Sequence, residues 1–147
     1  MVPDDAVNPG MLPSLLGFRL RVAHHAVVRD FTRSLSAFEL TPPMFGALEL
    51  MRSNPGLSQT ALAQALELDR SSVVPLIDAL ARRGLAERRP STTDRRRNQL
   101  WLTPAGQQLH GRAAEQVRDH EARLFAALGE RGRARLSGLL ERIGQER

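Results

Sequence analysis

The chain has 147 residues, the length of one domain, and its 41% hydrophobic and 25% charged residues are typical of a folded protein. It contains no cysteine, which excludes a disulfide scaffold, a thiolate nucleophile, a thiol redox switch and any zinc site built from cysteine. All 21 basic residues are arginine, and the segment from Arg82 to Arg97 alone carries the net charge of +5 of the whole chain, which indicates a site for a polyanion such as nucleic acid.

The first eleven residues contain two prolines, a glycine and two aspartates, and we expect residues 1–11 to form a flexible N-terminal tail. They have neither the basic start nor the apolar stretch of a secretory signal. Elsewhere no uncharged apolar run approaches the roughly 18 residues that a membrane-spanning helix needs. We therefore expect a cytoplasmic protein that makes no contact with a membrane.

Apolar residues recur at helical spacing from Leu12 to about Phe38 and predict one long helix. Its apolar stripe consists of Leu16, Leu20, Ala23, Val27 and Leu35. A helix of this length exceeds what the core of a small monomer needs. Residues 12–40 are therefore predicted to form a dimerisation helix.

Two helices with clear start signals follow. Thr41 and Pro42 have the residue types of an N-cap and a first helical position, and this helix is predicted to reach about Arg52, before the helix-breaking residues 54–56. Ser58 can cap the short helix after it, whose apolar positions are Ala61, Leu62, Ala65 and Leu66.

The next helix is predicted to begin at about Arg70 or Ser71 and to end at Arg83. Gly84 then occupies the position at which glycine commonly ends a helix. One face of this helix is apolar at spacings of three and four residues, formed by Val73, Leu76, Ile77 and Leu80. This face is predicted to be buried, which leaves the polar and small residues of the helix exposed.

An extended pattern follows, with predicted strands at residues 85–89 and 98–102 and turn residues at 90–94. The result is a β-hairpin with arginines at its tip. Thr103 and Pro104 start a long helix that is predicted to continue to Leu128, and a break is expected from Gly129 to Gly132. The final helix carries an apolar stripe of Leu136, Leu139, Leu140 and Ile143.

A short helix, a tight link, a second helix, a glycine stop and a basic hairpin together form the order of a winged helix-turn-helix. Residues 68–106 carry this pattern, and they resemble the MarR family of bacterial transcription regulators; the resemblance extends from about residue 12 to residue 143. Its marks are residues 69–72 and 83–85 at the two ends of the recognition helix, residues 87–88 and 94–96 in the wing, and residues 102–106 after it.

The resemblance implies a mainly α fold with a small β-hairpin wing and with dimerisation helices at both ends of the chain. The DNA-binding lobe would occupy residues 41–103, and the C-terminal dimerisation helices residues 104–147. The family also implies a homodimer, a palindromic site in double-stranded DNA, and a pocket for a small organic effector between the dimerisation helices and the DNA-binding lobe.

The recognition helix and the wing contain the residues that we expect to contact DNA, because a helix fits the major groove and arginine suits phosphates and narrow minor grooves. The resemblance also implies an ion pair between Asp94 and Arg96 that shapes the wing. Of Arg88 and Arg89, one is expected to reach phosphate and the other to be structural. The predicted DNA-binding residues are Arg70, Ser71, Ser72, Val74, Pro75, Arg82, Arg88, Arg95 and Arg97.

Pro75 departs from the family pattern, in which many members have a polar or basic residue at this position. Proline lacks an N–H group and disfavours a helix interior by about 3 kcal/mol. If Asp69 were the N-cap, Pro75 would be the sixth helical residue, whereas a cap at Ser71 or Ser72 would place it in or near the first turn. We therefore predict a late or distorted start of the helix, and apolar contacts from Val74 and Pro75 to groups such as thymine methyls.

No catalytic motif is present, so we expect neither an enzyme nor a cofactor. The four histidines, His24, His25, His110 and His120, are not spaced as metal ligands, and we predict no metal site. The resemblance places an effector pocket among the first, second and fifth helices, where arginine or histidine would suit a carboxylate or a phenolate. Candidate residues, each of which could instead serve core or dimer packing, are Phe18, Arg21, His24, His25, Arg29, Phe31, Met44 and Phe45.

The sequence therefore predicts a ligand-responsive repressor that a small aromatic or anionic effector releases from a palindromic operator. Two alternatives share most of the same features. One is a transcriptional activator with the same fold, and the other is an architectural DNA-binding protein that responds to no effector.

Overall fold

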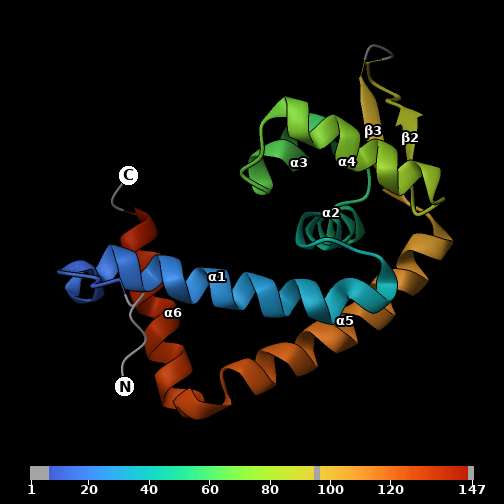
Figure 1. The fold of residues 1–147 in the computed structure, drawn as a ribbon. Helices are drawn as coiled ribbons and strands as arrows, with labels where there is room; N and C mark the ends of the chain where they lie inside the picture. The colour runs from blue at the N-terminus through green and yellow to red at the C-terminus, as the bar shows by residue number, and fades with distance from the viewer. Residues whose placement is uncertain (1–6, 95–96, 146–147) are drawn as a thin grey trace.

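The computed structural model describes residues 7–94 and 97–145, and within them the chain is mainly helical, with one small sheet (Figure 1). The long helices α1 and α5 pack along each other, and in the view of Figure 1 α6 crosses α1 near its start. The helices α2, α3 and α4 and the sheet form a separate lobe above them (Figure 1). The α-helices are α1 (Leu16–Leu35), α2 (Pro42–Ser53), α3 (Gln59–Ala65), α4 (Arg70–Arg82), α5 (Pro104–Leu124) and α6 (Gly129–Gln145). The strands are β1 (Leu57–Ser58), β2 (Ala86–Pro90) and β3 (Asn98–Leu102), and short 3-10 turns occupy Leu12–Ser14, Ser36–Phe38 and Ala126–Leu128.

Three predicted helix starts and the predicted glycine stop are confirmed, whereas the first helix begins at Leu16 and not at Leu12. The hydroxyl groups of Thr41, Ser58 and Thr103 each accept a hydrogen bond from a backbone N–H three residues later, at 3.4, 3.1 and 3.0 Å. Gly84 follows α4 with φ +67°, a left-handed conformation that glycine adopts without strain. The N–H of Gly84 and of the next residue bond back to carbonyls near the end of α4, which closes the helix.

The hairpin is confirmed, and a short third strand joins it. β2 and β3 pair antiparallel, with Ala86 opposite Leu102 and Pro90 opposite Asn98. β1 pairs with the other edge of β3, so the strand order is β1-β3-β2. The sheet therefore ties the chain just before α3 to the wing that follows α4.

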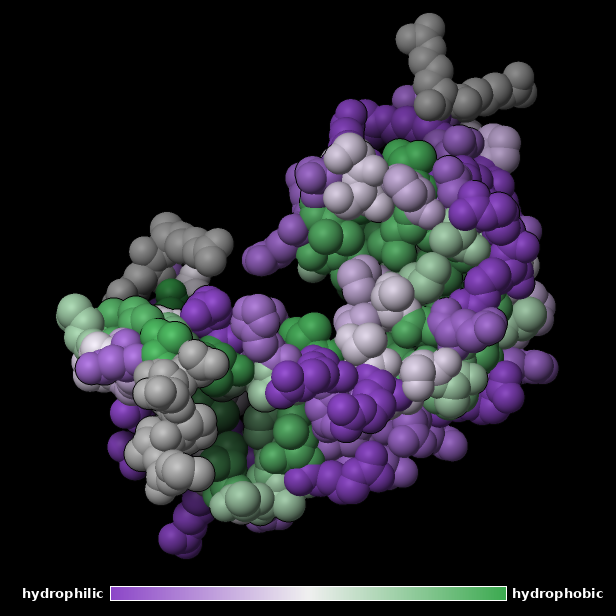
Figure 2. Space-filling model, viewed as in Figure 1, coloured by the Kyte–Doolittle hydropathy of each residue, from purple (hydrophilic) through white to green (hydrophobic). Residues whose placement is uncertain are grey.

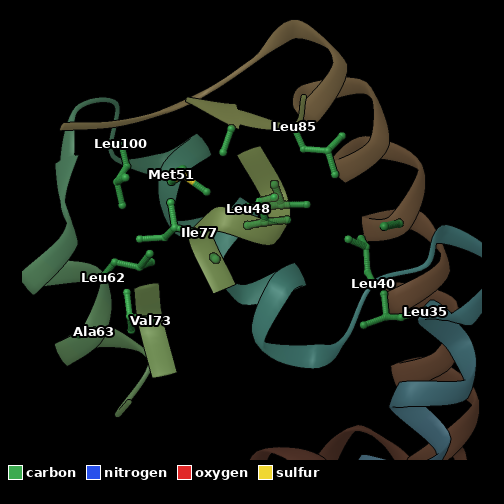
Figure 3. Packing of buried hydrophobic residues seen from close by; sticks show 14 residues of the cluster. Leu35, Leu40, Leu48, Met51, Leu62, Ala63, Val73, Ile77, Leu85 and Leu100 are labelled. Carbon is green, nitrogen blue, oxygen red and sulfur yellow. The ribbon is translucent and has the colours of Figure 1, made fainter. Parts of the chain in front are cut away.

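The hydrophobic core lies inside the lobe and reaches the end of α1 (Figure 3). Of the predicted stripe of α4, Val73, Ile77 and Leu80 are buried and Leu76 is half-buried. These residues pack with Leu48, Met51, Leu62 and Leu100 from α2, α3 and β3, while Leu35 and Leu40 extend the cluster toward α1. This packing fixes which face of α4 points outward.

The prediction of a late start for α4 was wrong. Asp69 is the N-cap: its carboxylate accepts hydrogen bonds from the backbone N–H of Ser72 and from the hydroxyl of Ser71, both at 2.7 Å. These bonds lower the pKa of the Asp69 carboxyl group, with the Ser71 hydroxyl bond as the largest cause. The cap fixes the first turn at Arg70, and Pro75 is accommodated as the sixth helical residue.

The predicted break between the last two helices was placed too late. α5 ends at Leu124, the chain turns through residues 126–128, and α6 begins at Gly129 and continues through Gly132. Gly129 has φ +62°, which lets the chain change direction there. A Cβ on Gly132 would lie 3.1 Å from the Cβ of Leu128, a tight contact that glycine avoids.

Candidate nucleic-acid interface

The outward face of α4 is formed by the residues that its amphipathic pattern predicts to be exposed. Its exposed residues are Arg70, Ser71, Ser72, Val74, Pro75 and Arg82. Their exposure is confirmed, whereas their contact with DNA stays a prediction. A single helix therefore presents polar, basic and apolar groups together on one accessible surface.

A polar groove of about 590 Å³ lies where the starts of α3 and α4 face the wing. Arg70 and Arg97, far apart in the sequence, both line it. The guanidinium of Arg70 donates a hydrogen bond to the hydroxyl of Thr60 at 3.3 Å. The other lining residues are Ser58, Gln59, Ala61, Gln64 and Asn98. Two arginines beside amide and hydroxyl groups suit the phosphates and base edges of a nucleic acid.

Three polar residues of this groove were not identified from the sequence. Gln59 and Gln64 carry a weak signal, because they are polar residues on the short helix that precedes the recognition helix. Asn98 carries none, since its position at the groove depends on the register of the hairpin.

The wing is organised by a buried serine that the sequence did not single out. The hydroxyl of Ser91 accepts hydrogen bonds from the backbone N–H groups of Thr93 and Asp94, both at 3.3 Å. Arg97 lies with its Nε 3.5 Å from the carboxylate of Asp94. Arg95 and Arg96 lie outside the described residues. The DNA contact of Arg95 and the ion pair between Asp94 and Arg96 therefore stay predictions.

The two strand arginines have partners within the chain. A nitrogen of Arg88 lies 2.7 Å from a carboxylate oxygen of Asp78, which joins β2 to α4. Arg89 bonds to Glu87 and stacks over the ring of Trp101, with its guanidinium carbon 4.7 Å from the ring centroid. Both arginines therefore make contacts within the chain at the base of the wing, and a phosphate contact from Arg88 stays a prediction.

Four aromatic rings connect the lobe to the long helices, and we call them the ring ladder. His120 of α5 stacks on Phe31 of α1, with ring centroids 5.6 Å apart. Phe31 meets Phe45 of α2 edge to face at 6.0 Å, and Phe45 stacks on His110 of α5 at 5.4 Å. The ring ladder therefore places α1, α2 and α5 in direct side-chain contact.

Both histidines of the ring ladder lie against carboxylates. The Nε2 of His110 is 2.5 Å from an oxygen of Glu49, and the Nδ1 of His120 is 2.9 Å from an oxygen of Asp30. The two histidines are almost fully buried, whereas the carboxylates are partly exposed. The carboxylates therefore border the buried imidazole rings on the side toward solvent, and the contact at the Nε2 of His110 does not have the geometry of a hydrogen bond.

The predicted effector residues do not form one cluster in the single chain. Phe31, Met44 and Phe45 pack at the margin of the core, where α1, α2 and α5 meet. Phe18 lies about 20 Å from Phe31 along α1, at 1.5 Å per residue, and its ring lies 5.1 Å from the guanidinium carbon of Arg21. His24, His25 and Arg29 are exposed on the helix between them. A role in effector binding stays a prediction for all eight.

Among residues 7–94 and 97–145, no group of three or more histidine, aspartate or glutamate side chains is arranged to hold a metal ion. Within the same residues, none of the helices combines the length and the apolar character needed to cross a membrane.

Replacing Pro75 measures how much this proline lowers the stability of the recognition helix. We expect Pro75→Ala to raise the free energy of unfolding by up to about 3 kcal/mol, because it restores a backbone hydrogen bond inside α4. Urea unfolding followed by circular dichroism measures this change. A variant no more stable than the parent would show that the helix accommodates the proline without cost.

Because the pKa of Glu49 is lowered, we expect the free energy of unfolding to fall in acid. A hydrogen bond from Arg52, at 2.8 Å, is the largest cause that lowers the pKa of Glu49 from 4.5 to about 2, with smaller contributions from Ser53 and His110. A carboxylate with a lowered pKa stabilises the folded state fully above pH 4.5, and this stabilisation is lost as the pH falls from 4.5 toward 2. We expect Glu49→Gln to remove that part of the pH dependence.

The measurement is the urea midpoint at pH 6, 4 and 2.5. The difference between the parent and Glu49→Gln should shrink toward the lowest pH. Glu115→Gln, on the exposed side of α5, is the matched control and should follow the parent throughout. A constant difference between the parent and Glu49→Gln would contradict the assignment.

The chain has well-defined relatives among known proteins. Residues 38–97 match the model of the MarR family. Over 135 residues the chain is 41% identical to a transcriptional regulatory protein for the hcr operon of Thauera aromatica, covering 91% of this chain and 81% of that protein.

Two solved structures of the transcriptional repressor CouR share the fold. The one bound to a 23-mer DNA duplex has a TM-score of 0.90 and 38% identity, and covers 95% of this chain and 99% of its own. The one bound to p-coumaroyl-CoA has a TM-score of 0.89 and 36% identity, and the match covers 97% of this chain and 100% of that CouR chain. With the helix order, the basic wing and the exposed recognition helix, these similarities show that the chain belongs to the MarR family of transcriptional regulators.

Proposed function

We propose that the protein is a homodimeric repressor that binds a palindromic operator in double-stranded DNA and is released by a small aromatic or anionic effector. The observation that carries this proposal is the combination of the exposed face of α4 with the polar groove toward the wing, which Arg70 and Arg97 line. An α-helix fits the major groove, and a neighbouring hairpin can reach the adjacent minor groove. Proteins of this family are transcription regulators and not enzymes.

The second half of the proposal is a dimer formed by α6 and the start of α1, which together we call the arm. No residue of α6 is buried within the chain, and its apolar stripe includes Leu139, Leu140 and Ile143, which are 45, 46 and 57% exposed. The start of α1 also exposes Leu16, at 76%. Figure 2 shows hydrophobic side chains gathered on this arm, away from the hydrophilic wing. Exposed apolar surface of this extent is typical of a subunit interface.

The effector is proposed to act where the long helices meet the lobe. The CouR structure with p-coumaroyl-CoA supports an aromatic, anionic ligand class for a chain 36% identical to it. In this chain the ring ladder links α1 and α5 to α2, so a ligand that shifts the long helices would also shift the recognition helices of the dimer. Such a ligand acts only through different affinities for the two arrangements.

Footprinting of the DNA upstream of its own gene tests the proposal. We expect the protein to protect one palindromic site whose half-sites are about 34 Å apart, and p-coumaroyl-CoA to weaken this binding while coenzyme A does not. Protection of no defined site would refute specific binding. Unchanged affinity with p-coumaroyl-CoA and with a panel of aromatic acids would refute the effector part.

A further inference from the structure

The outward face of α4 has an apolar centre. Val74 and the adjacent Pro75 lie three and four residues after Ser71 and four and three residues before Asp78, and Arg82 follows Asp78 by four, so these residues lie on one face of the helix. Val74 is 41% exposed and Pro75 is also exposed. We call these two residues the apolar window.

The polar side chains that border the window are engaged within the chain. The Ser71 hydroxyl donates to Asp69, and the Asp78 carboxylate is paired with Arg88, each at 2.7 Å. The side chains of Val74 and Pro75 have no donor or acceptor, and Pro75 also lacks a backbone N–H. The middle of the recognition face therefore presents hydrocarbon to whatever covers it.

The surrounding charges indicate what covers the window. Arg70 and Arg82 flank it on the same helix, and Arg97 lines the groove toward the wing. The partner must therefore be a polyanion that also carries apolar groups. In the major groove of duplex DNA, the apolar group is the C5-methyl of thymine.

There is room for such a group beside Val74. A hollow of about 370 Å³ is lined by Gln59, Thr60, Arg70, Val73 and Val74. It combines the apolar side chains of two valines with polar groups at its rim. A thymine methyl could enter this hollow while its base edge stays near the polar groups.

We infer that Val74 and Pro75 select thymine in the DNA site through contact with its C5-methyl group, in place of hydrogen bonds to base edges. The inference rests on the proposed function and names the base that part of the recognition helix reads. It also accounts for a proline inside a helix, because the residue sits on the surface that meets the DNA. Positions with poor local propensity are expected at functional sites.

The test uses the full-length protein and a duplex that it selects from a random pool of 24-base-pair duplexes. Each thymine of the selected duplex is replaced in turn by uracil, which differs only by the missing methyl. At one or more thymines in each half-site, we expect uracil to weaken binding about fourfold, the value of one buried methyl group. The remaining thymines should show no effect.

Variants assign the effect to the window. Val74→Ala and Pro75→Ala should each reduce the sensitivity to uracil at the corresponding thymine. Arg82→Ala, on the same face but outside the window, is the matched control: it should weaken binding to all duplexes and keep the uracil sensitivity.

The outcomes separate this inference from the proposed function. If the protein selects a duplex but no thymine is sensitive to uracil, the inference is wrong and the proposed function stands. The inference is equally wrong if both window variants keep the sensitivity of the parent. If no duplex is enriched, the proposed function fails, and the inference fails with it.

Discussion

Replacing Leu139 with aspartate should convert the protein into a monomer and lower its operator affinity by at least about 100-fold, because one recognition helix per molecule loses the advantage of simultaneous binding. Leu139 lies on the apolar stripe of α6 and is 45% exposed in the single chain. A charge buried there in a dimer would lack a partner and oppose association. Light scattering gives the mass, and fluorescence anisotropy with labelled DNA gives the affinity.

The matched control is Ala134→Asp, which places the same charge on the opposite face of the same exposed helix. It should leave both the dimer and the affinity unchanged, so that a loss of helix propensity is excluded as the cause. A Leu139→Asp protein that is folded, dimeric and fully active in DNA binding would show that α6 is not part of the interface.

Gly106→Ala should destabilise the fold by about 3 kcal/mol, the upper end of what overpacking commonly costs. A Cβ on Gly106 would lie 2.0 Å from the backbone oxygen of Leu85 and 2.8 Å from the side chain of Leu102. The same region is held by Thr103, whose hydroxyl donates to the carbonyl of Gly84 at 2.6 Å and whose N–H donates to Leu85. The start of α5 would have to move away from the base of the wing.

Gly111→Ala separates this clash from helix propensity. Gly111 lies in the same helix, and a Cβ there would meet nothing within 4 Å. Since alanine is favoured over glycine in a helix by about 1 kcal/mol, Gly111→Ala should raise the free energy of unfolding. Thermal unfolding of both variants measures the contrast. Equal stability of the two would contradict the close packing at Gly106.

Much of the fold follows from local signals in the sequence. Thr41, Ser58 and Thr103 cap helices as their residue types predict, and Gly84 ends α4. The apolar stripe of α4 also predicts its exposed face. Each of these features depends on a few neighbouring residues and on one repeating spacing, which is why the sequence alone reveals them.

Other features depend on contacts between distant residues. β1 has only two residues and exists because β3 offers an unpaired edge. The ring ladder joins α1, α2 and α5, and no local pattern shows that His110 faces Phe45. The start of α4 was mispredicted because the penalty for Pro75 was given more weight than the two hydrogen bonds to Asp69.

The candidate site follows the same division. The exposed residues of α4 were identified from its helical period, whereas the groove residues Gln59, Gln64 and Asn98 were not. The groove arises from the packing of α3 and α4 beside the hairpin, so its lining depends on tertiary structure. Six of the eight predicted effector residues spread along α1, because the resemblance indicates helices and not side-chain directions.

A single crosslinking measurement tests directly whether α4 lies on DNA. The chain has no cysteine, so Val74→Cys and Glu115→Cys each create one attachment point for a photoactivated crosslinker. The probe at position 74 is predicted to crosslink to the bases of an operator duplex, and the probe at position 115, on α5, is predicted not to. Efficient crosslinking from position 115, with none from position 74 in a protein that still binds the duplex, would contradict the placement of the recognition helix on DNA.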